Sequence, residues 1–328
     1  MGRIIPLLLS LLLLCGCASD SGSRVPAPDD ADRLVIFTAS SAAVYDDAVR
    51  EFERRTGIWV EVRTADGTLP LLEEIAAGGS GCDLLLGAAP DVLTAYAGCF
   101  APYASPLAAD IAAAYRDGED RWTPFSLLPL ALVYNDQLVQ RNVPDCWADL
   151  LSPAWRGRVA YPDPAVTAVG YTALQALLQT GGEAETVLPA LYRNGSGVLP
   201  SAAAVVEAVA DGSCYVGVTT EDLALRAAES GRSVTVVYPA EGTVVQPDCA
   251  AVVRDCAHGD SARAFIDFLL SDEVQTRLAR QSRRAVRGSA AGGGVLPQAL
   301  AYDADEAGSA LPELLALWNS LTAEEAAA

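Results

Sequence analysis

The 328-residue chain holds 42 acidic and 22 basic residues, a formal net charge of −20. This balance argues against nucleic acid as a partner, because phosphate backbones are bound by clustered positive charge. Every basic residue is an arginine, and a chain without lysine has no Walker A loop, no Schiff-base chemistry and no Ser-Lys nucleophile.

The N-terminus is typical of a secretory signal peptide, here residues 1–16. Arg3 precedes the apolar run Ile4–Leu14, which is too short for the ~20 residues of a membrane-spanning helix. The cysteine after Gly16 resembles that of a bacterial lipobox, so we expect Cys17 to be acylated and to anchor the exported protein to the outer face of the cytoplasmic membrane. The alternative is an ordinary cleaved signal. Residues 17–32, rich in Ser, Pro and Asp, are expected to form a flexible linker.

From residue 33, β-branched apolar runs alternate with segments of helical periodicity. This order predicts a parallel sheet with helices on both faces. The expected elements are strands at 33–40, 59–64 and 82–88, each followed by a helix, at 42–57, 69–79 and 90–98.

The same alternation restarts after the apolar segment 127–135. We expect strands at 157–164, 198–201, 214–220 and 233–239, with helices at 169–182, 202–213 and 221–231. An amphipathic helix over 260–281, a glycine-rich break at 292–294 and a helix over 311–321 complete the chain. Two α/β groups predict two lobes, 33–128 with 246–328 and 129–245, linked by crossing strands at 127–135 and 249–255.

Six cysteines follow the leader: Cys82, Cys99, Cys146, Cys214, Cys249 and Cys256. An even number in an exported chain indicates disulfides. The sequence leaves all fifteen connectivities open, and we favour Cys82 with Cys99 because they bracket one strand–helix unit. A single histidine and no CxxC spacing argue against a zinc site.

Hydroxyl- and glycine-bearing loops recur where predicted strands lead into helices. They are Thr38–Ser41, Ala65–Thr68, Pro162–Thr172 and Gly217–Asp222. Free N–H groups at helix N-termini, together with hydroxyls, suit a polar or anionic ligand in a cleft between the lobes. Each loop taken alone is also explained by ordinary helix capping, since Ser and Thr are common N-caps.

The chain resembles the extracytoplasmic solute-binding proteins of ABC importers, in the subfamily named for ferric iron that also serves phosphonates, sugar phosphates and thiamine. The resemblance is carried in this order by "AVREFERRTGIWVEV", "WADLLSPAWRGRVAYPDPAVTAVGYTALQALL", "VVEAVADGSCYVGVTTED", "VVYPAEGTV" and "ARAFIDFLLSDEVQTRLAR". It implies a two-lobed α/β fold of the type II periplasmic-binding-protein kind, which closes by a hinge on a ligand between the lobes.

The resemblance also implies which residues contact the ligand. The first lobe would contribute Ser40, Ser41, Gly67 and Thr68. The second lobe would contribute Thr167, Gly170, Tyr171, Thr172, Ser201, Thr219, Thr220 and Glu221. Iron binders of the family carry adjacent tyrosines at the start of the helix after the "VG" strand, where this chain has "TTED" at 219–222.

The preferred ligand is therefore a phosphonate, sugar phosphate or similar organophosphate, and a ferric-iron importer is the alternative. An amine-bearing ligand would pair with Glu221 or Asp222, and its positive charge would be compatible with the negative net charge of the chain. A structural or sensory surface lipoprotein is a further alternative. We expect a monomer that docks on an ABC permease and needs no cofactor.

Two remaining features bear on whether the chain is an enzyme and on whether it binds an anion through arginines. His258 lies in a loop before a predicted helix, and no GxSxG elbow is present, so we expect no enzyme. The cationic segment Ser282–Arg287 could reach an anionic ligand or the permease, but at a helix end a solvated cluster is the simpler interpretation.

Overall fold

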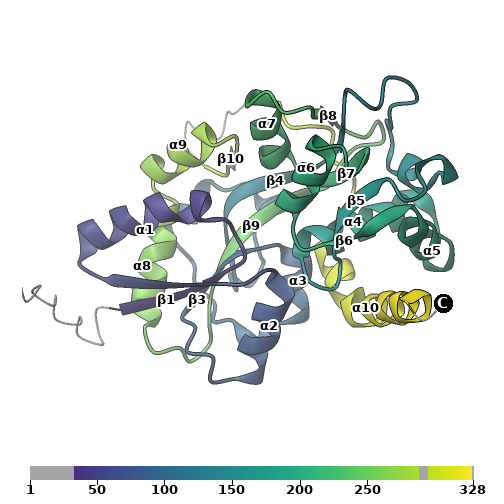
Figure 1. Ribbon diagram of the computed structural model, residues 1–328. Helices are drawn as coiled ribbons and strands as arrows, with labels where there is room; N and C mark the ends of the chain where they lie inside the picture. Colours follow the sequence, from purple (N-terminus) through teal and green to yellow (C-terminus); the bar gives the residue numbers. More distant parts are fainter. Residues whose placement is uncertain (1–32, 288–294, 327–328) are drawn as a thin grey trace, which may run out of the picture.

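A computed structural model describes residues 33–287 and 295–326. The predicted signal peptide, the lipidation site Cys17, the linker 17–32 and the glycine-rich break lie outside the described residues. The described strands form one curled mixed sheet in the order β2-β1-β3-β9-β4-β7-β5-β6, and β8 and β10 add to β4. Figure 1 shows a two-lobed arrangement with β4 and β9 between the lobes. The α/β, two-lobed prediction is confirmed.

The first lobe is built on the predicted parallel strands. β1 lies between β2 and β3, and its side chains from Leu34 to Phe37 are buried on both faces of the sheet. Its elements are β1 (Arg33–Thr38), α1 (Ala42–Thr56), β2 (Trp59–Thr64), α2 (Thr68–Ala77), β3 (Leu84–Ala88) and α3 (Pro90–Ala95). Short 3-10 turns follow at Ala97–Cys99, Pro106–Asp110 and Ala113–Tyr115.

Strand β4 (Thr123–Tyr134) runs from one lobe into the other. Its first half, up to Pro129, pairs antiparallel with β9 (Val245–Val252), and its second half, from Leu130, pairs antiparallel with β7 (Val216–Thr220). Pro129 donates no backbone hydrogen bond, which fits its place where β4 changes partners. The crossing strand that we predicted over 127–135 corresponds to β4.

The second lobe repeats the strand–helix alternation around β7. Its remaining elements are 3-10 turns at Trp147–Leu151 and Pro153–Trp155, then β5 (Val159–Pro162), α4 (Ala168–Gly181), α5 (Ala184–Asn194), β6 (Gly195–Leu199), α6 (Ala202–Ala210), α7 (Glu221–Glu229) and β8 (Thr235–Val237). Helix α5 was not predicted, because Pro189 and the surrounding glycines are typical of a break.

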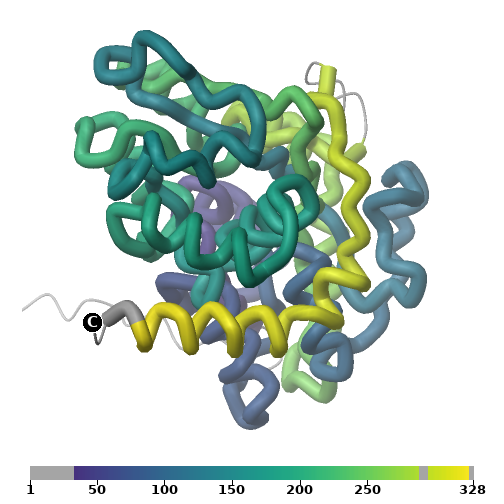
Figure 2. Tube along the Cα trace, turned by 90° about the vertical axis from the view of Figure 1, so that its right-hand side faces the viewer, coloured from purple at the N-terminus to yellow at the C-terminus, as the bar shows by residue number. Residues whose placement is uncertain are grey.

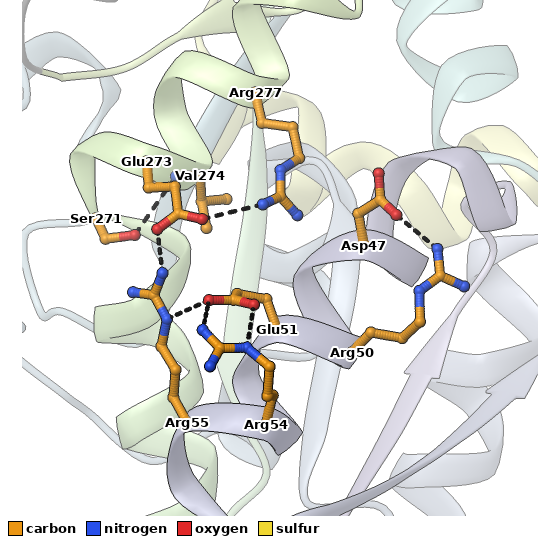
Figure 3. A network of polar contacts seen from close by, with 9 residues as sticks. All are labelled: Asp47, Arg50, Glu51, Arg54, Arg55, Ser271, Glu273, Val274 and Arg277. Atoms are coloured by element: carbon orange, nitrogen blue, oxygen red, sulfur yellow. Dashed lines mark hydrogen bonds and ion pairs between the residues drawn. The ribbon is translucent and has the colours of Figure 1, made fainter.

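The chain then returns to the first lobe through α8 (Gly259–Leu269), α9 (Asp272–Arg280) and β10 (Arg284–Ala285). The prediction of a single helix over 260–281 is wrong, because the structure has two helices there, α8 and α9. Ser271 caps α9 by accepting from the Val274 N–H, so the helix divides there. Figure 3 shows α9 held to α1 through Glu273, which pairs with Arg55 of α1 and with Arg277 of its own helix.

Helix α10 (Ala304–Ala326) touches both lobes. The segment before it passes along one side of the molecule, and α10 then crosses a face (Figure 2). Near its start, Gly308 packs so closely on α3 that an added Cβ would lie 2.5 Å from the Asp91 carbonyl oxygen. Near its end, the Trp318 ring lies 5.9 Å from the Tyr161 ring of β5 and 6.3 Å from the Tyr192 ring of α5.

All six cysteines in the described part of the chain are free thiols, so the favoured Cys82–Cys99 disulfide is not formed. Cys82 is buried at the start of β3 and its thiol donates to the Leu84 carbonyl, while Cys99 lies partly exposed in a 3-10 turn. Burial raises the pKa of the Cys82 thiol to about 12, which keeps it protonated.

Candidate functional site

A cavity of about 360 Å³ lies between the two lobes. Both lobes supply its walls, and the ends of β1, β2, β5, β6 and β7 all open toward it, as expected for ligand sites of α/β sheets. Its polar lining residues are Ser40, Ser41, Asp66, Thr68, Thr167, Thr172, Ser201, Thr220, Asp222, Arg226, Gln246, Asp248 and Arg283.

On the first-lobe side, two helix N-termini reach the cavity without side-chain caps. Ser41 precedes α1, and its side chain accepts no hydrogen bond from the helix. Gly67 precedes α2 and has no side chain that could cap it. In the first turns, the Val44 N–H bonds to the Ser41 carbonyl, the Leu69 N–H bonds to the Val166 carbonyl, and Pro70 has no N–H. The first-turn amides that remain without a carbonyl partner among the described residues are those of Ala42, Ala43 and Thr68. Together with the hydroxyls of Ser40, Ser41 and Thr68, they form a donor-rich surface that favours negative charge.

On the second-lobe side, two of the predicted hydroxyls do act as caps. Thr167 accepts from the Gly170 N–H at 2.9 Å, and Ser201 accepts from the Ala204 N–H at 3.1 Å. Both residues nevertheless line the cavity. The Ser201 hydroxyl can accept this bond and still donate its own proton into the cavity, whereas the Thr167 hydroxyl already donates to the Asp163 carbonyl at 2.9 Å.

The cleft is closed where α2 meets the loop before α4. The Leu69 N–H donates to the Val166 carbonyl at 3.1 Å, which links the lobes through their backbones. Gly67 allows this approach, since a Cβ at that position would lie 2.3 Å from the Val166 carbonyl oxygen. The backbone of Gly67 is extended, so the glycine is required by space and not by backbone conformation.

The inner end of the cavity carries balanced charges. Arg283 lies 2.5 Å from Asp248 of β9 through Nη1, and its Nε lies 3.3 Å from Asp222 of α7. Asp222 also accepts from Arg226 at 3.2 Å and from the Thr220 hydroxyl at 2.6 Å. Burial raises the pKa of Asp248, and the charge of Arg283 opposes that shift.

A buried hydrogen-bond network lies beside the cavity wall. The Asp91 carboxylate accepts from Thr172 at 2.6 Å, from Gln246 at 2.8 Å and from the Tyr302 hydroxyl at 2.6 Å. Burial raises the pKa of Asp91. These residues come from α3, α4, β9 and the segment before α10, so the network joins both lobes to the C-terminal part of the chain.

Four of the predicted ligand residues lie outside the cavity lining. Gly170 packs against the Pro162 and Asp163 backbone, and the Tyr171 hydroxyl donates to the Ala307 carbonyl. Thr219 donates to the Ala202 carbonyl, and Glu221 is fully buried in an ion pair with Arg284. The other eight, Ser40, Ser41, Gly67, Thr68, Thr167, Thr172, Ser201 and Thr220, line it.

Several lining residues were not predicted from the sequence, namely Arg226, Gln246, Asp248 and Arg283. Only Arg283 carried a signal, as part of the cationic segment 282–287, and the expectation of a solvated cluster there is wrong. Arg283 is buried, Arg284 pairs with Glu221, and Arg287 donates to the Leu270 carbonyl at 2.5 Å.

Neither tyrosine nor histidine is among the described residues that line the cavity. The one group of possible metal ligands within the described ranges, Asp145, Cys146 and Asp149, lies elsewhere, before and within the Trp147–Leu151 turn. A second hollow of about 460 Å³ lies between the 114–122 segment and residues 299–305 and shares Gln246 with the cavity wall.

Proteins of known structure share the fold of this chain. Residues 93–310 match the family model described as "Bacterial extracellular solute-binding protein". The chain belongs to this family. As a solute-binding protein it lies outside the cytoplasm and binds a small solute for an ABC importer. No helix in 33–287 or 295–326 is long and apolar enough to cross a membrane.

Individual relatives are distant. An uncharacterized protein of Haemophilus influenzae is 26% identical over 285 residues, 83% of this chain and 81% of that protein. A periplasmic protein of Salmonella typhimurium is 25% identical over 53% of each chain, and 2-aminoethylphosphonate binding is attributed to it. The present chain therefore spans about half the length of that relative. The periplasmic binding protein AfuA of Actinobacillus pleuropneumoniae, solved with fructose-6-phosphate, has the same fold: TM-score 0.78, 22% identity, 88% of this chain and 97% of that one.

Proposed function

We propose that the protein captures a small solute bearing a phosphonate or phosphate group and delivers it to an ABC permease by closure of its lobes. The observation that carries this proposal is the pair of helix N-termini without side-chain caps, those of α1 and α2, at the cavity between the lobes. In a chain without lysine, helix amides and hydroxyls are the natural partners of a tetrahedral anion.

The ligand residues proposed for the first lobe are Ser40, Ser41, Gly67 and Thr68, and for the second lobe Thr167, Thr172, Ser201 and Thr220. The hinge follows the proposed lobes, 33–128 with 246–328 and 129–245, because β4 changes partners between Pro129 and Leu130. The ligand stabilises the closed form through contacts that exist only when both lobes meet.

Two relatives support the ligand class. The Salmonella protein is associated with a phosphonate, and AfuA was solved with a sugar phosphate. A ferric site is disfavoured by its donors, because the described lining offers no tyrosine and two of its three carboxylates, Asp222 and Asp248, are already paired with arginines. We further propose a monomer without enzymatic activity, held at the membrane by lipid on Cys17.

A ligand panel tests the proposal. The purified protein is heated with ethylphosphonate, 2-aminoethylphosphonate, glucose-6-phosphate, fructose-6-phosphate, thiamine and ferric citrate. A ligand at ~100 times its dissociation constant adds about 2.7 kcal/mol of stability. We expect the largest shift from a phosphonate or a sugar phosphate. The largest shift from ferric citrate, with a visible charge-transfer band, would overturn the organic-ligand proposal.

The anchor has its own test. A Cys17→Ser variant, expressed in a bacterial host that processes lipoproteins, is expected in the soluble extracytoplasmic fraction, while the unchanged protein sediments with membranes. Several acyl chains on one cysteine hold a protein firmly, whereas a single chain binds only marginally. Retention of the variant with the membranes would contradict lipid anchoring.

A further inference from the structure

The inner end of the cavity contains an arginine that comes from the opposite lobe to one of its partners. Arg283 follows α9 in the first lobe, and it faces both Asp248 of the same lobe and Asp222 of the second lobe. All three side chains are buried and all three line the cavity. The guanidinium therefore lies between two buried carboxylates in the cavity wall.

The two carboxylates are already supplied with donors by the protein. Asp222 accepts from Thr220 through Oδ1 and faces both Arg226 and Arg283 through Oδ2. Asp248 has Arg283 Nη1 at 2.5 Å. Nη1 also donates to the Ser126 hydroxyl at 3.1 Å, whereas the Nε–H faces Asp222 as an ion pair and makes no hydrogen bond among the described residues. The guanidinium therefore keeps unused donor capacity at this place.

We infer that Arg283 is a specificity-determining residue which stands where a ligand ammonium group would otherwise sit, so that the cavity selects phosphonates without an amine. This inference rests on the proposed function. Two buried carboxylates at the end of an anion-binding cavity would, on their own, select a zwitterion. With the guanidinium between them, a ligand ammonium meets balanced charge and must displace Arg283 or remain unpaired.

A matched pair of ligands measures this selection. Ethylphosphonate and 2-aminoethylphosphonate differ only in the ammonium group, and their dissociation constants are compared by titration calorimetry. We expect the wild-type protein to bind ethylphosphonate at least about tenfold more tightly. In R283Q the two carboxylates lose their internal cation, and the ratio of the two dissociation constants is expected to fall about tenfold or more toward the amine.

Arg284 provides the control. It also pairs with an acidic residue of α7, Glu221, with Nε to Oε2 at 2.7 Å, but Glu221 does not line the cavity. R284Q should therefore leave the ratio of dissociation constants unchanged. If R283Q does not fold, as checked by circular dichroism, R283Q/D248N also removes the carboxylate that loses its arginine and is used in its place, since Asp222 keeps Arg226.

A second measurement does not depend on phosphonates. Millimolar ethylammonium should raise the melting temperature of R283A, by occupying the vacated place between the carboxylates, and should leave the wild-type protein and R284A unaffected. A wild-type preference for 2-aminoethylphosphonate, an unchanged ratio in R283Q, or no rescue by ethylammonium each overturns the inference. If neither phosphonate binds the wild-type protein, the proposed ligand class fails, and the rescue alone decides the role of Arg283.

Discussion

The backbone N–H of Leu69 donates to the carbonyl oxygen of Val166 at 3.1 Å, and this bond joins the first turn of α2 to the loop that precedes α4. The two residues belong to different lobes. Because the bond is made by backbone atoms, it requires the main chains themselves to meet. The contact defines a closed cleft, and it depends on the absence of a side chain at Gly67.

Gly67→Ala is expected to weaken ligand binding by tenfold or more. An added Cβ would lie 2.3 Å from the Val166 carbonyl oxygen, a contact that the closed form cannot accept without moving the loop. The open form has room for the methyl group, so the fold should persist. Titration calorimetry with the ligand identified by the panel measures the loss.

Gly98→Ala is the matched control, because an added Cβ there meets no atom within 4 Å. Equal affinities for the Gly67 and Gly98 variants would show that closure does not bring α2 and the Val166 loop together.

Thr172→Val is expected to destabilise the protein by about 1–2 kcal/mol. The Thr172 hydroxyl donates to the buried Asp91 carboxylate, which would lose one of its donors. Thr180→Val, on the same helix, removes a partly exposed hydroxyl that donates to the Ala176 carbonyl, and should cost less than about 0.5 kcal/mol. Urea unfolding compares the two, and equal losses would deny Thr172 a place in the network.

Trp318→Ala tests the attachment of α10 to the second lobe. The side chain is 1% exposed and packs on Tyr161 and Tyr192, so its loss is expected to cost about 3–5 kcal/mol. Leu317→Ala removes a neighbour that is 46% exposed and should change little. If the two variants unfold at the same urea concentration, α10 does not hold the second lobe.

Glu51 predicts a pH dependence of stability. Hydrogen bonds from Arg54 and then Arg55 lower its pKa from 4.5 to about 2 (Figure 3). A depressed pKa in the folded state gives a contribution that is present above pH 4.5 and is lost as the pH falls toward 2. Glu51→Gln should therefore lower the urea midpoint at neutral pH, with a difference from the wild type that shrinks on acidification.

Glu229→Gln, at the exposed end of α7, serves as the control for that experiment. A difference between Glu51→Gln and the wild-type protein that stays constant from neutral pH to pH 2 would contradict the role of the arginines.

Periodicity was sufficient to predict most of the strands and helices, but not β10 or the start of β4. The runs 33–40 and 82–88 are apolar on both faces, as in buried parallel strands, and the structure has β1 and β3 there. Equivalent strand ends then predicted where hydroxyl-bearing loops would converge, and Ser40, Thr68, Thr167 and Ser201 do line one cavity. Local rules were enough because these residues lie at the ends of their own elements.

The rest of the site depends on contacts between distant segments. Arg283 looked like part of a solvated cluster, since nothing near it in the sequence announces Asp222 or Asp248 as partners. Gln246 and Tyr302 reach Asp91 across more than 150 residues of chain, and a pattern with a period of two or 3.6 residues carries no information on such pairs. Only the folded topology brings them together.

In the proposed complex the anion of the ligand lies at the N-termini of α1 and α2. The most direct test is a ¹⁵N–¹H spectrum of the protein during titration with the best ligand of the panel. We expect the largest shifts on the first-turn amides Ala42, Ala43 and Thr68. Shifts confined to the second hollow, around Gly118 and Ala304, with those three amides unmoved, would contradict it.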